Sequence, residues 1–293
     1  MSAVTAPTTP PKVIARDPKV VRNERLKDAA TYLLLIIACT LTTGPIIFLV
    51  ATSLKETYTK TVDLSVFLNP TFVNYSKIWN EHPFKDWMRN SLLVATAVTI
   101  GILILDSLAG YAFARKKFRG KDTIFFLILA TLMVPLPVTL LPIFLLANDL
   151  GWIDTYRALI FPALAYPVGV FMMRQFIETI PGELEDAARI DGMSDLGIYL
   201  RVILPLCIPG LAVLGLYTFT TSWGAFLWPL IVATSDATRT IPPGLATIPG
   251  QYNTDWGLAT AATVASMIPM LFIFLIFQRY LRQGFSGGRS TKG

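Results

Sequence analysis

The stretch that decides the fold lies in the second half of the chain. It reads Glu178-Thr-Ile-Pro-Gly-Glu-Leu-Glu-Asp-Ala-Ala-Arg-Ile-Asp-Gly192, followed by Met193-Ser-Asp-Leu-Gly-Ile-Tyr-Leu-Arg-Val-Ile-Leu-Pro205. Pro181 suits the first turn of a helix, and the acids after it suit the positive end of the helix dipole. The Asp-Gly pair then breaks that helix, and Ser194 is a good cap for another. We therefore expect a helix, a sharp turn and a second helix.

The first of these helices is expected to carry a narrow face of small apolar groups. Leu184, Ala187 and Ala188 are spaced at i, i+3 and i+4, so they share one side of a helix. Carboxylates border this side. Such a face fits a groove on another protein, and the alternative is an amphipathic loop that meets only water.

Long apolar segments flank this stretch on both sides. The chain has 293 residues, of which 53% are hydrophobic and only 15% charged, and its mean hydropathy is +0.56. A soluble domain carries about 25% charged residues, so the composition excludes a disordered chain and an ordinary water-soluble enzyme. A membrane-spanning helix needs ~20 apolar residues. Six segments meet that length, at 29–54, 91–114, 123–147, 158–177, 202–233 and 258–281.

The sequence therefore predicts an all-α, polytopic membrane protein with six transmembrane helices. The N-terminal residues lack the apolar core of a signal peptide. They are rich in Pro, Thr and charged residues, so we expect residues 1–28 to be a flexible tail. The expected order is then a first transmembrane helix at 29–54, an extracytoplasmic loop at 55–86, a membrane-embedded core at 87–281 with a cytoplasmic loop at 178–205, and a tail at 282–293. Pro and Gly interrupt the third to fifth spans, as expected where a transporter lines a path.

The charges predict the orientation and exclude several kinds of site. Most of the 25 Lys and Arg residues fall in the N-terminal tail, the loops after the second and fourth spans, and the C-terminal end. By the positive-inside rule these parts are cytoplasmic, with both termini inside. The net charge of +6 is assigned to these anchoring loops rather than to nucleic-acid binding. One His and two Cys favour neither a metal site nor a disulfide framework, and no catalytic motif is present.

The opening stretch also resembles a known loop. Asp186-Ala187-Ala188, three residues, Gly192, nine residues and Val202-x-Leu204-Pro205 match the EAA pattern Glu-Ala-Ala-x3-Gly-x9-Ile-x-Leu-Pro, with Asp for Glu and Val for Ile. Tyr111-Ala-Phe-Ala-Arg115, Val134-Pro135 and Phe171-Met-Met-Arg-Gln-Phe176 are similar to the same family. Over roughly residues 29–284 the chain resembles the permeases of bacterial binding-protein-dependent ABC importers, in particular the carbohydrate branch and the smaller membrane subunit of maltose transporters.

The resemblance implies a fold, a function and partners. Family members have the type I ABC importer permease fold and sit in the bacterial inner or plasma membrane. Each pairs with a second permease subunit, here expected to be a different one, above two cytosolic ATPase subunits that bind the ATP. An extracytoplasmic solute-binding protein delivers the cargo. The resemblance assigns ATPase coupling to one loop, whose residues here are Glu183, Glu185, Asp186, Ala187, Ala188, Asp191 and Gly192.

Two further groups are candidates for contact with cargo or binding protein. Aromatic and hydroxyl side chains at membrane depth suit the binding of a sugar. The candidates for the substrate path are therefore Tyr217, Thr221, Ser222 and Trp223. The alternative is that they only pack between helices. In the outer loop, Gln251, Tyr252 and Asn253 follow a Pro-Gly turn. The resemblance implies that they meet the binding protein, and the alternative is a solvated connector.

Three rival functions remain. A permease for glycerol phosphates would need inward-facing basic groups, and Arg174 is the one basic residue near a span's inner half. A proton-coupled secondary transporter would use an intramembrane acid, for which Asp106 is the candidate; the alternative role for Asp106 is to tie two helices together. A membrane enzyme would need clustered acid–base groups, and the acids at 183–186 are instead spaced as in a docking helix.

Overall fold

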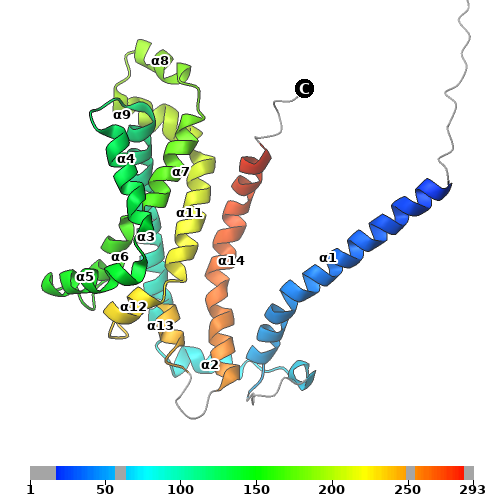
Figure 1. The fold of residues 1–293 in the computed structure, drawn as a ribbon. Helices are drawn as coiled ribbons and strands as arrows, with labels where there is room; N and C mark the ends of the chain where they lie inside the picture. Colours follow the sequence, from blue (N-terminus) through cyan, green and yellow to red (C-terminus); the bar gives the residue numbers. More distant parts are fainter. Residues whose placement is uncertain (1–17, 57–63, 249–254, 287–293) are drawn as a thin grey trace, which may run out of the picture. The chain divides into compact units, whose positions relative to one another are not determined.

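The computed structural model describes residues 18–56, 64–248 and 255–286, and all regular structure in these ranges is helical. The chain divides into two units, one ending at Val50 and the other beginning at Ala51. The described part of the first unit is helix α1 (Pro18–Ser53), whose last three residues belong to the second unit. Figure 1 shows the helices of the second unit, which contains the features considered below.

Six apolar segments correspond to the predicted spans. Three of them are single helices that are long and apolar enough to cross a membrane. They are Lys27–Ser53 within α1, Phe84–Arg115, which is α3, and Trp256–Arg279 within α14 (Trp256–Ser286). The others are bent pairs of helices. These pairs are Lys121–Met133 with Pro137–Asp149, Tyr156–Leu164 with Pro167–Glu178, and Asp195–Leu206 with Ile208–Trp223. Their main helices are α4 (Lys121–Ala130), α5 (Leu136–Asp149), α6 (Tyr156–Ile160), α7 (Pro167–Glu178), α9 (Asp195–Ile198) and α11 (Ile208–Trp223). With each pair counted as one span, the predicted number of six is confirmed.

The remaining helices are short. They are α2 (Val73–Asn80), α8 (Glu183–Ile190), α10 (Leu204–Leu206), α12 (Leu227–Val232) and α13 (Ile241–Leu245). Brief 3-10 turns, η1 (Leu64–Phe67), η2 (Thr131–Met133) and η3 (Phe161–Leu164), and a π-helical turn, η4 (Tyr199–Ile203), complete the described chain.

The third to fifth predicted spans are broken, as their Pro and Gly residues indicated. The segment 123–147 is interrupted at Val134, whose ψ of 116° is extended, because a residue before proline is pushed out of the helical region. The segment 202–233 stops as a helix at Trp223 and resumes only at Leu227. Pro229 cannot donate a backbone hydrogen bond to the residue four positions earlier, so a continuous helix through this point is disfavoured.

The centre of the second unit is α3, which packs against α7 and α11, while α11 also packs against α14 (Figure 1). The approach of α3 to α7 depends on glycine. A Cβ at Gly110 would lie 2.6 Å from the Cβ of Met173 and 2.9 Å from the backbone nitrogen of Arg174. Small residues of this kind allow membrane helices to pack backbone to backbone.

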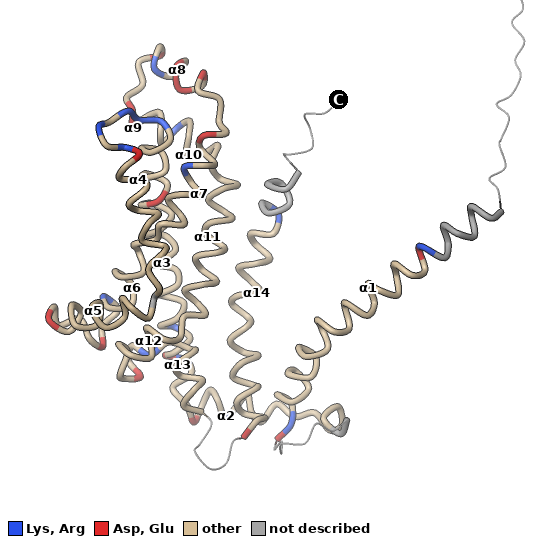
Figure 2. Tube along the Cα trace, viewed as in Figure 1, with Lys and Arg blue, Asp and Glu red and all other residues tan. Residues whose placement is uncertain are grey.

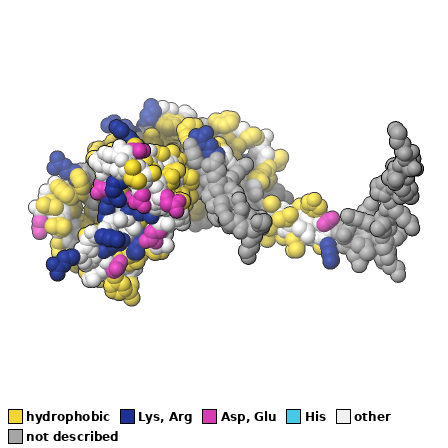
Figure 3. Space-filling model, turned by 90° about the horizontal axis from the view of Figure 1, so that it is seen from above, with side chains coloured by type: hydrophobic (Ala, Val, Ile, Leu, Met, Phe, Trp, Pro, Cys, Tyr) yellow, Lys and Arg dark blue, Asp and Glu magenta, His cyan; other side chains and the backbone are white. Residues whose placement is uncertain are grey.

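Charged residues of the second unit gather at its two ends, and the middle of its long helices is almost free of them (Figure 2). One end carries α8 and α9, and the other carries α5, α12 and α13. Seen from the α8 side, acidic and basic side chains are interspersed with apolar ones (Figure 3). This distribution is the one expected for helices that cross a bilayer.

Candidate functional site

The segment 178–205 has the predicted helix-turn-helix form. Helix α8 begins after Pro181-Gly182 with acids in its first turn and ends at Ile190. Gly192 has φ +81°, a left-handed conformation that glycine adopts without steric cost. The Ser194 hydroxyl accepts a hydrogen bond of 3.2 Å from the backbone N–H of Gly197, so the predicted cap of α9 is confirmed.

The two faces of α8 differ from the predicted ones. Ala188 is buried against the rest of the second unit, whereas Leu184 and Ala187 are exposed. Ile190 continues their side of the helix and is 87% exposed. The outward apolar face is therefore Leu184, Ala187 and Ile190, and the predicted inclusion of Ala188 was wrong because that side of α8 rests on α9 and η4.

The acids of the loop also separate into two groups. The side chain of Glu185 is only 7% exposed and forms an ion pair with Arg115, with 2.9 Å between Oε1 and Nε. This contact joins two charges without the alignment of a hydrogen bond. Asp186 is the opposite case: its side chain is 74% exposed and its nearest cation is Arg189, at 3.8 Å. Glu183 and Asp191 are exposed as well.

A cavity of about 370 Å³ lies between α3, α5, η3, α11 and α12. Most of its wall is apolar, and its hydroxyl groups come from Ser91, Tyr166, Thr218, Thr221, Ser222 and Thr240. No charged side chain from the described residues lines it. The Oγ1 atom of Thr240 is buried and finds no hydrogen-bond partner in the described structure.

The four predicted path residues do not all reach this cavity. Thr221 and Ser222 line it. Tyr217 is half exposed, and its ring centroid lies 6.3 Å from that of Tyr166, a cavity residue. Trp223 points elsewhere: it is buried and stacks on Phe219 at 5.7 Å. The structure therefore brings two of the four candidates to the cavity wall.

Asp106 is buried in α3 at its contact with α7. A Cβ added at Gly169 of α7 would collide with the Asp106 carboxylate, so the two helices meet here through a glycine. The Oδ2 atom of Asp106 has no hydrogen-bond partner among the described residues. Asp106 does not line the cavity.

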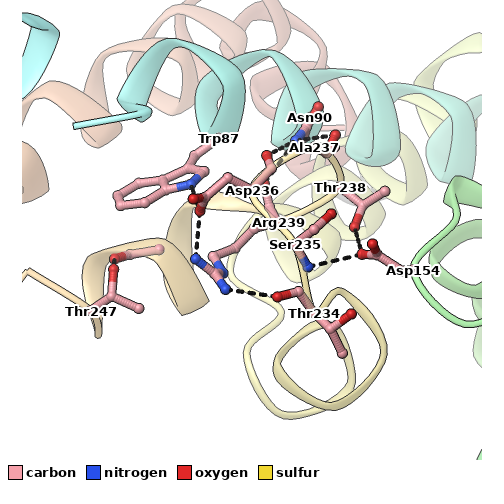
Figure 4. A network of polar contacts seen from close by, with 11 residues as sticks. Trp87, Asn90, Asp154, Thr234, Ser235, Asp236, Ala237, Thr238, Arg239 and Thr247 are labelled. Atoms are coloured by element: carbon pink, nitrogen blue, oxygen red, sulfur yellow. Dashed lines mark hydrogen bonds and ion pairs between the residues drawn. The ribbon is translucent and has the colours of Figure 1, made fainter.

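The predicted outer-loop residues Gln251, Tyr252 and Asn253 lie outside the described residues. A polar network in the first part of the same predicted loop was missed by sequence reasoning (Figure 4). Asn90 of α3 donates to the carbonyl oxygens of Ala237 and Arg239 at 3.1 and 2.9 Å, and accepts from the Tyr156 hydroxyl at 2.6 Å. These hydrogen bonds hold the segment around Ala237 and Arg239 against the N-terminal part of α3.

Asp154 holds the same segment from the other side. Its carboxylate accepts hydrogen bonds from the backbone N–H of Ser235, at 3.0 Å, and from the Thr238 hydroxyl. Burial alone would raise the pKa of Asp154, but these hydrogen bonds outweigh it and hold the pKa below its ordinary value. The only signal in the sequence is that Asn90 and Asp154 are polar residues beside predicted spans.

Comparisons with known proteins identify the family. Residues 106–287 match the family described as binding-protein-dependent transport system inner membrane component. The arabinooligosaccharides transport system permease protein of Halalkalibacterium halodurans is 38% identical over 69% of this chain and 72% of its own. The sn-glycerol-3-phosphate transport system permease protein of Yersinia enterocolitica is 31% identical over 90% of this chain and 98% of its own.

The fold is shared with a solved structure. A chain of a bacterial ABC transporter involved in import of the acidic polysaccharide alginate superposes with a TM-score of 0.77, at 24% identity, over 88% of this chain and 98% of that one. That similarity supports the type I ABC importer permease fold. The chain therefore belongs to the family of inner membrane components of binding-protein-dependent transport systems, and is a multi-pass membrane permease.

Proposed function

We propose that this chain is one permease subunit of an ATP-driven ABC importer, that it forms half of the transmembrane path for a sugar, and that it performs no catalysis itself. The observation that carries the coupling role is the outward apolar face of α8, Leu184, Ala187 and Ile190, which stands on a helix whose opposite side is tied into the permease by Glu185. An exposed apolar stripe on an anchored helix suits docking into a groove.

The proposal includes the partners that such a subunit needs. A second permease subunit completes the path, and two cytosolic ATPase subunits bind ATP and receive α8. An extracytoplasmic solute-binding protein delivers the cargo to the opposite end. The excess of Lys and Arg in the loop 115–121 and in both terminal segments supports a cytoplasmic position for both termini.

Within the loop, the exposed residues are the proposed contacts with the ATPase. Asp186 is the proposed partner for a cation there, with Glu183 and Asp191 nearby, and Gly192 supplies the turn. Gln251, Tyr252 and Asn253 remain the proposed contacts with the binding protein. The division into a tail, a first helix, an outer loop and a core at 87–281 is retained as part of the proposal.

A neutral sugar is the proposed cargo. The cavity presents hydroxyl groups in an apolar wall, which suits a sugar's hydroxyl groups and its apolar faces. A phosphorylated cargo would be expected to meet Arg or Lys. Arg174 is engaged elsewhere: its Nε pairs with Glu178 at 2.9 Å, and its guanidinium lies 4.0 Å from the Phe125 ring centroid.

Relatives of this chain are named for both kinds of cargo, arabinooligosaccharides and sn-glycerol-3-phosphate. Uptake of labelled arabinooligosaccharide and labelled glycerol-3-phosphate by cells carrying the complete transporter distinguishes them. We expect saturable uptake of a neutral sugar, unaffected by excess glycerol-3-phosphate. Saturable uptake of glycerol-3-phosphate alone would contradict the cargo assignment while leaving the permease role intact.

Docking of α8 is tested by photo-cross-linking. Ile190→Cys, in a background with Cys39→Ser and Cys207→Ala, is labelled with a cysteine-reactive benzophenone. Asn148→Cys, an exposed position beyond the other end of the spans, is the matched control. We expect a cross-link to the ATPase from position 190 and none from position 148. Equal labelling of the ATPase from both positions, or from neither, would contradict docking through this face.

A further inference from the structure

The cytoplasmic end of α3 is joined to three segments by a single side chain. Arg115, the last residue of α3, forms the ion pair with Glu185 of α8. Its guanidinium also donates to the carbonyl oxygen of Ile177, at 2.9 Å, and to that of Ile180. These carbonyls lie at and just beyond the C-terminal end of α7, where the negative end of the helix dipole favours a cation. Arg115 therefore links α3, α7 and α8.

A second set of contacts surrounds this link. The Tyr111 hydroxyl donates to Oε2 of Glu185 at 3.3 Å. The Tyr111 ring packs against Tyr199, with centroids 5.3 Å apart, and the Tyr199 hydroxyl is hydrogen-bonded to Ser107 at 2.7 Å. Side chains from about two turns of α3 thus reach α8 and the start of the span that follows it.

The neighbouring helix α9 is tied to the same place. Lys116, directly after α3, forms an ion pair of 2.5 Å with Asp195, the first residue of α9. Its ammonium group also lies 5.0 Å from the Tyr111 ring centroid. Both helices of the coupling loop are consequently attached to the end of α3, whose outer half lines the cavity through Ser91, Val94, Val98 and Ile102.

We propose that Arg115 and Glu185 form a clamp that makes α8 move together with α3 and α7, so that a displacement of α8 by the ATPase reaches the helices around the cavity. The inference rests on the proposed function and adds to it a division of labour between adjacent acids. Glu185 is a positioning residue that faces the permease, and Asp186 faces outward. Transmission requires a stiff link, and a partly buried pair with several further contacts is stiffer than an exposed one.

The test uses the complete transporter in proteoliposomes, with its ATPase and binding protein. The variants are Glu185→Gln and Arg115→Gln, singly and together, and Asp186→Asn is the matched control. Three quantities are measured: the amount of co-purified ATPase, the rate of ATP hydrolysis, and the sugar transported per ATP hydrolysed. We expect both single variants to retain ATPase at the wild-type ratio and to keep hydrolysing ATP.

The sugar transported per ATP should fall at least about fivefold in each single variant, the lower end of typical coupling between sites. The double variant should be no worse than either single one, because both remove the same link. Asp186→Asn should lower the amount of bound ATPase and leave sugar per ATP near the wild-type value. Arg115→Lys keeps the charge but loses the planar fork, and should give a smaller loss of coupling in a well-folded chain.

Several outcomes would overturn the clamp. One is an unchanged sugar-to-ATP ratio in Arg115→Lys and in an assembled Glu185→Gln variant. Another is loss of the ATPase from Glu185→Gln but not from Asp186→Asn, which would make Glu185 the docking acid. Failure of the proposed function looks different, because the wild-type transporter itself would then show no ATP-dependent uptake.

Discussion

Replacing Asn90 by Ala should destabilise the contact between the N-terminal part of α3 and the segment that joins α12 to α13. Asn90 is 2% exposed, and its amide satisfies the carbonyls of Ala237 and Arg239 and the hydroxyl of Tyr156. A stranded buried polar group costs about 1–3 kcal/mol. Ala237 is exposed, so water can reach part of this site, and we expect a total loss of roughly 2–4 kcal/mol.

The variant Asn90→Asp tests whether the hydrogen bonds of Asn90, rather than the size of its side chain, stabilise this contact. The carboxylate has nearly the same size as the amide and can still accept from Tyr156, but it places an oxygen opposite two carbonyl oxygens. We therefore expect Asn90→Asp to be at least as destabilising as Asn90→Ala at neutral pH. Asn80→Ala is the control, because Asn80 is exposed and its side chain donates to one partner within the described part of the chain, the Ser76 hydroxyl at 3.1 Å.

The assay is the thermal unfolding midpoint of the purified transporter in detergent at a fixed scan rate. A loss of roughly 2–4 kcal/mol in a chain of this size corresponds to a fall of about 5–15 °C, whereas Asn80→Ala should stay within about 2 °C of wild type. The reasoning is refuted if Asn90→Ala and Asn80→Ala unfold together, or if Asn90→Asp is clearly more stable than Asn90→Ala.

Three further predictions use the same measurement or a pull-down. Gly110→Ala should lower the free energy of unfolding by about 1–3 kcal/mol, because its Cβ meets the backbone of α7. Gly224→Ala is the control, since a Cβ at Gly224 has its closest contact at an ordinary 3.5 Å. Equal unfolding midpoints for the two variants would contradict this prediction. Gly192→Ala forces a side chain into a left-handed turn, at a cost of about 1–2 kcal/mol, and should weaken recovery of the ATPase in a pull-down more than Gly192→Asn does. Because hydrogen bonds from Ser235 and its neighbours lower the pKa of Asp154 in the folded protein, its stabilising contribution is full above the unfolded-state pKa, about 3.9, and is lost as the pH falls through the folded-state pKa. Asp154→Asn should therefore be less stable than wild type at pH 7, with the difference shrinking on acidification below about pH 4; a pH-independent difference would count against this role.

Local signals in the sequence predicted the spans and the coupling loop well. Apolar length identified all six spanning segments, since only helices of that length satisfy their backbone in lipid. The turn at Gly192 and the cap at Ser194 were also predicted, because each depends on residues within a few positions along the chain. Breaks in the third to fifth spans were also expected from their Pro and Gly residues, but their positions, such as those near Val134 and Gly224, were not predicted.

The orientation of individual side chains could not be read from the sequence. Adjacent residues on a helix point about 100° apart. From the sequence alone, either Glu185 or Asp186 could face the rest of the permease, and only the position of Arg115, 70 residues earlier, shows that Glu185 does. The contact between Asn90 and the segment after Val232 likewise joins parts of the chain that are distant in sequence. Such pairings follow from how α3, α7 and α11 pack, and no local pattern contains that information.

The account's central claim is that this permease imports sugar at the expense of ATP bound by partner subunits. The most direct measurement is uptake of labelled sugar into proteoliposomes that contain this chain, its partner permease and its ATPase, with ATP enclosed and binding protein outside. The account predicts uptake that requires both ATP and binding protein and that continues in the presence of a protonophore. Uptake that persists without the ATPase subunits and collapses with the protonophore would contradict it, and would make Asp106 the centre of a proton-coupled carrier.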